Sequence, residues 1–343
     1  MKKNILMLIV LLILGGFTYY LVDNDKDDVA KTIDDYDFSY RDFAIENIDD
    51  VAKIIVVNRT KGVFTFQKHN NTWFVNDSFI ASKMLVNNML AVFQRIKIDY
   101  VPTEAAQMNA MKGMMLNGIK VEIYDKNGNA MKKYFVGDSP QNSIGTYFVM
   151  DGYSKPLVMT MPGFKGNLRV RFSYSLNNWR DRTVLGEIPE NIKKIELKYY
   201  IDKNSSFVLE REKDKFEIHP AFPDEKEISK PLDQKFANSY LVSFTKKIAE
   251  GLIADKEFIE NVLNQQLLAE LNIERKNGTK KSLRILMSPS FDKELLPNNK
   301  GIYKYFNNKV HRYFAQDDKG DIYQIQYGVF DDVLIPYQSF FKK

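Results

Sequence analysis

The sequence repeats one order of elements twice, with a period of about 145 residues. Short apolar/polar alternations that predict strands occur at 51–56, 63–68 and 73–75, and again at 192–197, 206–211 and 216–218. Equivalent positions keep a nearly constant separation, with 141 residues from Ile54 to Ile195 and 143 from Phe64 to Phe207. A repeat of this length is far longer than a solenoid unit, so each copy is expected to be a domain.

A helix and a hairpin follow the strands in each copy. Apolar stripes at helical spacing predict the two helices, and they consist of Leu85, Met89, Phe93 and Ile96 in one copy and Phe236, Tyr240, Phe244 and Ile248 in the other. Asn127-Gly128 and Asn277-Gly278 lie between alternating strands and predict hairpin turns. We therefore predict an α+β fold of two tandem homologous domains, 46–185 and 186–343, each an antiparallel sheet with helices packed to one side.

The N-terminus predicts a membrane anchor. Residues 4–22 carry no formal charge and, as a helix, would extend roughly 28 Å, close to the thickness of the bilayer core. A cleaved signal peptide is the competing interpretation, but Tyr19 and Tyr20 stand where that class has small residues before a cleavage site. We expect residues 1–22 to be an uncleaved transmembrane helix that contacts membrane lipid through 4–22, followed by an acidic stalk at 23–45.

Charge around this helix predicts its orientation. Lys2 and Lys3 precede it, whereas Asp23, Asp25 and Asp27 follow it, and basic flanks stay in the cytoplasm. The expected location is thus the inner (cytoplasmic) membrane, single-pass, with the N-terminus cytoplasmic and the C-terminal body periplasmic. A lipoprotein is excluded because the chain has no cysteine to carry the lipid.

The overall charge disfavours a nucleic-acid partner. The chain has 49 basic and 44 acidic side chains, a net charge of only +5, and its basic residues are interspersed with acidic ones. With no cysteine, an exported body of this size must rely on its apolar core for stability.

The sequence contains no recognisable catalytic, cofactor-binding or metal-binding motif. A Gly-x-Ser-x-Gly turn, a phosphate-binding loop and paired histidines at zinc-ligand spacing are all missing from it. No cofactor is therefore predicted, and the protein is not expected to be an enzyme. A carboxylate-dependent hydrolase acting on cell-wall or carbohydrate material is the alternative, because two acids that meet only in space leave no sequence signature.

Two segments at the end of the first copy are candidates for a partner or interdomain site. They comprise Pro162, Gly163 and Phe164, and Trp179, Arg180, Asp181 and Arg182. The first predicts a tight, shaped turn. In the second, Arg180 and Arg182 could form bidentate pairs that fix a domain joint, or could build a site for an anionic ligand or partner.

Several segments resemble one family of bacterial membrane-anchored proteins. They are Asp42-Phe43-Ala44-Ile45, the run 117–124, Gly145-Thr146-Tyr147, Pro162-Gly163-Phe164 with Gly166, and Trp179-Arg180-Asp181-Arg182. Over about residues 40–185 the chain is similar to the family catalogued as domain of unknown function 4340, and the second half resembles it more weakly. The resemblance implies no assigned active site, and some relatives look to be associated with ABC transporters of the gliding-motility type.

The expected function is therefore that of a non-enzymatic, membrane-anchored periplasmic binding or scaffold protein. Its expected partner is an envelope protein, of which an ABC transporter subunit or a gliding-type machine is the example that the resemblance implies. An exposed apolar patch or an open sheet edge would favour binding. A pocket with two facing carboxylates would favour the hydrolase.

Overall fold

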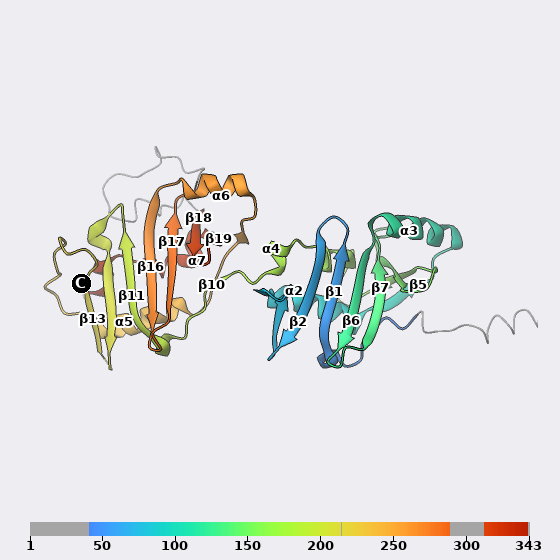
Figure 1. The fold of residues 1–343 in the computed structure, drawn as a ribbon, viewed down its shortest axis with the longest axis horizontal. Coiled ribbons are helices and arrows are strands. Elements are labelled where there is room, and N and C mark those ends of the chain that lie inside the picture. The colour runs from blue at the N-terminus through green and yellow to red at the C-terminus, as the bar shows by residue number, and fades with distance from the viewer. Residues whose placement is uncertain (1–40, 214, 289–311, 342–343) are drawn as a thin grey trace, which may run out of the picture. The chain divides into compact units, whose positions relative to one another are not determined.

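The computed structural model describes residues 41–213, 215–288 and 312–341 (Figure 1). They form two compact units. The first comprises the described residues up to Val63 together with Asn88–Ser173, and the second comprises Phe64–Asn87 together with the described residues from Tyr174 onward. This division assigns residues 64–87 to the second unit, and the domain boundaries 46–185 and 186–343 stay a prediction.

The predicted anchor at 1–22 and nearly all of the predicted stalk at 23–45 lie outside the described residues. Among the helices of the described ranges, none is both long enough and apolar enough to cross a membrane.

Two large antiparallel sheets confirm the predicted α+β class. The first has nine strands in the order β4-β3-β2-β1-β6-β7-β8-β9-β5, namely β1 (Val51–Asn58), β2 (Gly62–His69), β3 (Thr72–Val75), β4 (Phe79–Ile80), β5 (Lys97–Tyr100), β6 (Ile119–Asp125), β7 (Ala130–Val136), β8 (Thr146–Met150) and β9 (Leu157–Thr160). The second has eight in the order β13-β12-β11-β16-β17-β18-β19-β15, namely β11 (Ile192–Tyr199), β12 (Phe207–Glu212), β13 (Lys215–Pro220), β15 (Gly251–Leu252), β16 (Leu267–Arg275), β17 (Lys280–Leu286), β18 (Arg312–Asp317) and β19 (Ile322–Gln326). A small sheet pairs β10 (Thr183–Leu185) with β14 (Lys247–Ile248).

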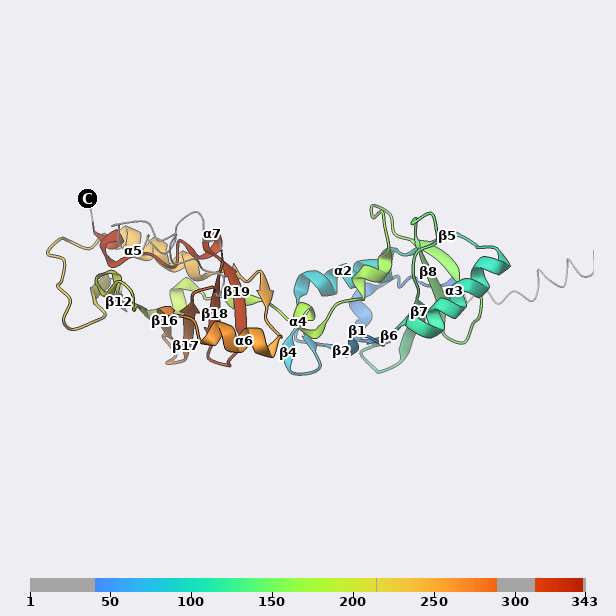
Figure 2. The ribbon, with the colours of Figure 1, turned by 90° about the horizontal axis from the view of Figure 1, so that it is seen from above.

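Helices fill the connections between these strands. The α-helices are α2 (Lys83–Arg95), α3 (Glu104–Asn117), α4 (Leu176–Trp179), α5 (Gln234–Tyr240), α6 (Lys256–Leu263) and α7 (Tyr327–Phe330). The 3-10 turns are η2 (Ile48–Asp50), η3 (Leu168–Arg171), η4 (Pro189–Asn191), η5 (Lys203–Ser205), η6 (Leu241–Phe244) and η9 (Tyr337–Phe340). Helix α3 lies beside β7 in both views (Figure 1, Figure 2).

The two sheets repeat one topology and one irregularity. Each sheet contains eight strands in the same spatial order relative to their order in the chain, and the first sheet has β4 as a ninth strand at its edge. Between β1 and β6 the register shifts between Val51 and Lys53, and between β11 and β16 it shifts between Ile192 and Lys194. These two places are related by the same 141-residue offset that relates Ile54 to Ile195.

The predicted Asn-Gly hairpins are confirmed. Gly128 (φ 84°) joins β6 to β7, and its N–H donates to the Asp125 carbonyl at 3.2 Å. Gly278 (φ 81°) joins β16 to β17, and its N–H donates to the Arg275 carbonyl at 2.9 Å. Glycine fits both turns because it adopts positive φ without a Cβ clash.

The predicted helices are confirmed in one copy and partly wrong in the other. Helix α2 buries Leu85, Met89 and Phe93 as expected. Helix α5 ends at Tyr240, the chain continues as the 3-10 turn η6, and Ile248 lies in strand β14. The hydroxyls of Ser239 and Thr245 donate to carbonyls three residues earlier, at 2.8 and 2.9 Å, which favours a tighter turn over a continued α-helix.

Aromatic side chains fill the core of each unit. In the first unit the ring of Tyr134 lies 5.9 Å from that of Phe43 and 5.4 Å from that of Phe148, measured between centroids. In the second unit Phe340 packs edge-on against Phe207 and Tyr240, at 4.8 and 5.1 Å. Many of the aromatic residues in the sequence thus fill the cores of the two units.

Candidate functional site

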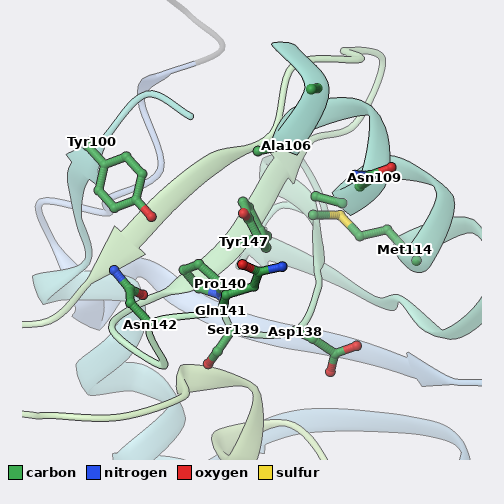
Figure 3. Close-up of a pocket in the computed structure, with 13 residues that line it drawn as sticks. Tyr100, Ala106, Asn109, Met114, Asp138, Ser139, Pro140, Gln141, Asn142 and Tyr147 are labelled. Carbon is green, nitrogen blue, oxygen red and sulfur yellow. The ribbon is translucent and has the colours of Figure 1, made fainter. Parts of the chain in front are cut away.

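A cleft of about 590 Å³ opens in the first unit between α3 and the connection from β7 to β8 (Figure 3). The helix contributes small and uncharged side chains, Ala105, Ala106, Asn109, Ala110, Gly113 and Met114. The connection contributes Asp138, Ser139, Pro140, Gln141 and Asn142, and the strands contribute Tyr100 and Tyr147. Figure 3 shows Tyr147 between the helix and the connection, with Tyr100 across the cleft from Asn109.

Helix α3 forms for local reasons and is held to the unit at few points. Alanine, methionine and glutamine favour helix, the Thr103 hydroxyl accepts from the Ala106 N–H at 3.4 Å, and Gly118 closes the end by donating to the Met114 carbonyl at 2.7 Å. Met114, at 6% exposure, is the buried residue of the helix. Met115 is 79% exposed. Much of the helix surface is therefore available to other molecules.

Two arginines hold the C-terminal end of α3. Arg169 Nη1 donates to the Val136 carbonyl at 3.0 Å, its Nη2 donates to the Asn117 carbonyl, and its Nε lies 3.4 Å from the Asp138 carboxylate. Arg59 Nη1 donates to the Leu116 carbonyl at 3.2 Å. Cations stabilise this end of a helix because its last carbonyls lack partners within the helix.

The turn predicted from Pro162, Gly163 and Phe164 forms a few residues before Arg169. Arg95 donates to the Pro162 carbonyl at 2.6 Å, and Gly163 has a φ of 80°. A few residues on, the Asn167 side chain accepts from the Arg169 N–H at 2.8 Å and starts the 3-10 turn η3.

Phe164 lies in this turn, and its ring packs against Arg171. The Arg171 guanidinium lies 4.6 Å from the centre of the Phe164 ring. The predicted turn residues do not line the cleft.

The cleft presents neutral polar groups. Asp138 is the carboxylate of its lining, and it is paired with Arg169. Within the described part of the chain, the amides of Asn109 and Gln141 and the hydroxyls of Tyr100 and Tyr147 have no hydrogen-bond partner. Burial, and secondarily the nearby Tyr100, raises the pKa of Tyr147, so its hydroxyl stays protonated and can donate.

Trp179 and Arg180 pack within the second unit. Trp179 is fully buried, its ring centre lies 4.8 Å from that of Phe66, and its carbonyl accepts from the Ser82 N–H at 2.7 Å. The Arg180 guanidinium lies 3.9 Å over the Phe79 ring and forms an ion pair with Asp321. The guanidinium of Arg180 is thus already engaged.

Asp181 and Arg182 also bond to the protein. Asp181 accepts from the Thr183 N–H at 2.6 Å, and Arg182 donates to the Glu250 carbonyl. All of these contacts lie within the second unit, so the predicted role of Trp179–Arg182 at a domain joint stays a prediction. The segment's role in partner binding also stays a prediction.

A second cavity, of about 770 Å³, includes Arg180 and Asp181 in its lining. Much of its charge is compensated internally, because Glu187 accepts from Arg275 at 2.7 and 2.8 Å and Asp321 pairs with Arg180. Across the described ranges, no cluster of three or more acidic or histidine side chains is arranged to hold a metal ion.

One family model matches more than half of the chain. It is described as a domain of unknown function (DUF4340), and it covers residues 81–275. The chain belongs to this family. The DUF4340 match includes the α3 cleft, the turn at Pro162 and the Trp179–Arg182 segment, and it extends beyond residue 185 into the half of the chain where the sequence resemblance is weaker. No curated protein and no solved structure matches the chain.

The sequence motifs did not identify the cleft as a site. Tyr147 belongs to the Gly145-Thr146-Tyr147 segment, but Asn109, Gln141 and Arg169 carry no motif that marks them. The one available signal was the run 105–115, which combines alanine, methionine and glycine and lacks the apolar stripe of α2.

Proposed function

We propose that this protein is a non-enzymatic binding module that engages an envelope partner through the α3 cleft. The observation that carries the proposal is the neutral lining of the cleft, with unpartnered amides and hydroxyls beside apolar side chains. Binding sites commonly combine such apolar surface with a few polar groups that fix orientation.

Exposed apolar side chains on α3 and on the connections that contribute to the cleft support binding to another macromolecule. Met108, Met115 and Leu116 on α3 are 61%, 79% and 62% exposed, and Val101 and Ile144 on the adjoining segments are 51% and 59% exposed. An exposed apolar surface of this kind is typical of interaction sites. Methionine suits it because the unbranched thioether adapts to varied partners.

The alternative function, a carboxylate-dependent hydrolase, is less well supported by this cleft. That chemistry requires two carboxyl groups on either side of a scissile bond. Among the residues that line this cleft, Asp138 is the one carboxylate, and it forms an ion pair with Arg169.

The location we propose is the inner membrane of a bacterial cell, with residues 4–22 as a single-pass anchor and the body in the periplasm. The apolar run and the acidic residues after it support this topology. The partner would then be an envelope protein, such as the ABC transporter subunit or gliding-type machine that the family resemblance implies.

We also infer that the two sheets arose by duplication of one ancestral domain. Their shared strand order and equivalent register shifts support this origin. That the helices of each domain pack on one side of its sheet stays a prediction.

Site-specific photo-crosslinking in intact membranes tests the binding function. A photoreactive amino acid at Met108, which is 61% exposed on α3, is expected to capture one envelope protein reproducibly. Val242, 55% exposed in the second unit, provides the control position. Identical products from both positions, or none from Met108, would overturn the proposal.

A further inference from the structure

We propose that the α3 cleft binds an extended, uncharged stretch of polypeptide. This inference rests on the binding function proposed above and names the chemical class of its ligand. Three features support it, namely the polar groups of the cleft, the open edge of β5, and the charge balance of the lining.

The free polar groups of the cleft match the needs of a peptide backbone. Asn109 and Gln141 each offer both an amide N–H and a carbonyl oxygen, and Tyr147 offers a hydroxyl. An extended peptide presents N–H and C=O groups in alternation, and each needs a partner when it leaves water. Amide side chains can supply both kinds of partner.

Strand β5 provides an open sheet edge next to these groups. It is the last strand in its sheet, it pairs with β9 along one side, and its final residue, Tyr100, lines the cleft. Among the described residues, the backbone groups of Lys97–Tyr100 bond to no other segment. An extended peptide can add to such an edge through main-chain hydrogen bonds.

The charge of the cleft favours an uncharged segment. Its carboxylate, Asp138, is paired with Arg169, and the other lining side chains are neutral. A charged ligand group buried there would lose hydration without gaining a counter-ion. The alanines and Met114 instead suit apolar ligand side chains. The volume, about 590 Å³, is in the range of known ligand sites.

Gly113 allows the cleft to be filled with little strain. A Cβ at this position would meet nothing within 4 Å, and the position lines the cleft. Gly113→Trp should therefore occupy the binding volume while α3 remains helical. Val242→Trp, at a 55% exposed position in the second unit, is the control for an added bulky side chain.

The test uses the full chain in lipid nanodiscs and a displayed library of random heptapeptides, selected on wild type alone. Selected sequences are synthesised with capped termini, and their affinities are measured by fluorescence anisotropy. We expect uncharged, apolar-rich peptides that bind Gly113→Trp about tenfold or more weakly, which corresponds to about 1.4 kcal/mol, and that bind Val242→Trp with an affinity within about twofold of wild type. A central lysine or aspartate should weaken binding to wild type about tenfold or more.

Hydrogen exchange locates the bound peptide. We expect added protection in β5, α3 and residues 138–142. Equal binding to wild type and Gly113→Trp, selection of charged peptides, or no selected peptide at all would overturn the inference. Protection of the cleft by a neutral oligosaccharide such as chitotriose, without peptide binding, would also overturn it.

The photo-crosslinking at Met108 separates this inference from the binding function. If it still captures an envelope protein while no peptide binds, only the peptide class fails. If it captures nothing, the binding function fails as well.

Discussion

Met114 should control how firmly α3 is held to the first unit. It is the buried residue of a 14-residue helix, and its Cε and Cγ atoms would lie 2.9 and 3.0 Å from a Cβ placed on Gly137. Met114→Ala removes the packing of this side chain against Gly137 but leaves the hydrogen bonds of Arg169 and Arg59 at the end of the helix. The adjacent Met115, 79% exposed, offers a matched control in Met115→Ala.

The size of the effect follows from burial. Truncation of a buried methionine to alanine usually costs about 2–5 kcal/mol, and the cost is lowest where the surroundings can close the cavity. An exposed helix can move inward, so we expect about 2 kcal/mol for Met114→Ala, against at most about 0.5 kcal/mol for Met115→Ala. Isolated helices of this length are marginal in water, so the loss should appear as local opening of α3.

Native-state hydrogen exchange measures this opening directly. A loss of about 2 kcal/mol corresponds to exchange about 30-fold faster for amides in α3 of Met114→Ala, with amides of β6 and β7 nearly unchanged. Equal acceleration in Met115→Ala, or unchanged exchange in α3 of Met114→Ala, would refute this view of how the helix is held.

Three further predictions concern other parts of the molecule. Tyr134→Phe should raise the free energy of unfolding by about 1–3 kcal/mol in urea titrations, since the buried hydroxyl has no hydrogen-bond partner among the described residues; destabilisation would contradict this. Arg275→Met should lower it by about 3–5 kcal/mol because Glu187, 6% exposed, would lose its partner, and adding Glu187→Leu should recover most of that loss in the same assay. The hydrogen bond from Lys120 lowers the pKa of Glu122 below its ordinary value of 4.5. The stabilisation that this pair adds to the folded state is therefore complete above pH 4.5 and is lost as the pH falls through the folded-state pKa. The melting temperature of Lys120→Gln should therefore fall less than that of wild type as the pH drops below about 4.5. An equal fall in both proteins would exclude the Lys120–Glu122 pair as a cause of acid destabilisation.

Local patterns predicted the strands and hairpins well. Alternation at Ile54 and Ile195 and the glycines Gly128 and Gly278 reflect constraints that act over a few residues. The helix predicted through Ile248 failed because side-chain hydroxyls and the pairing of β14 with β10 are not visible in apolar spacing.

The cleft could not be predicted in the same way. Tyr100, Asn109 and Gln141 belong to different elements, and only the folded chain brings them together. The support by Arg169 is equally hidden, because two of its partners are backbone carbonyls, which every residue possesses. By contrast, the turn at Pro162 and Gly163 could be predicted because a turn has a local sequence signature.

Binding of an envelope partner through the α3 cleft is the central claim, and crosslink yield from Met108 in intact membranes tests it most directly. The comparison combines the photoreactive residue with wild-type Gly113, Gly113→Ala and Gly113→Trp at equal expression. We predict that one envelope protein is captured in similar yield with glycine and alanine, and that tryptophan reduces the yield about tenfold or more. An unchanged yield with tryptophan would contradict binding through this cleft.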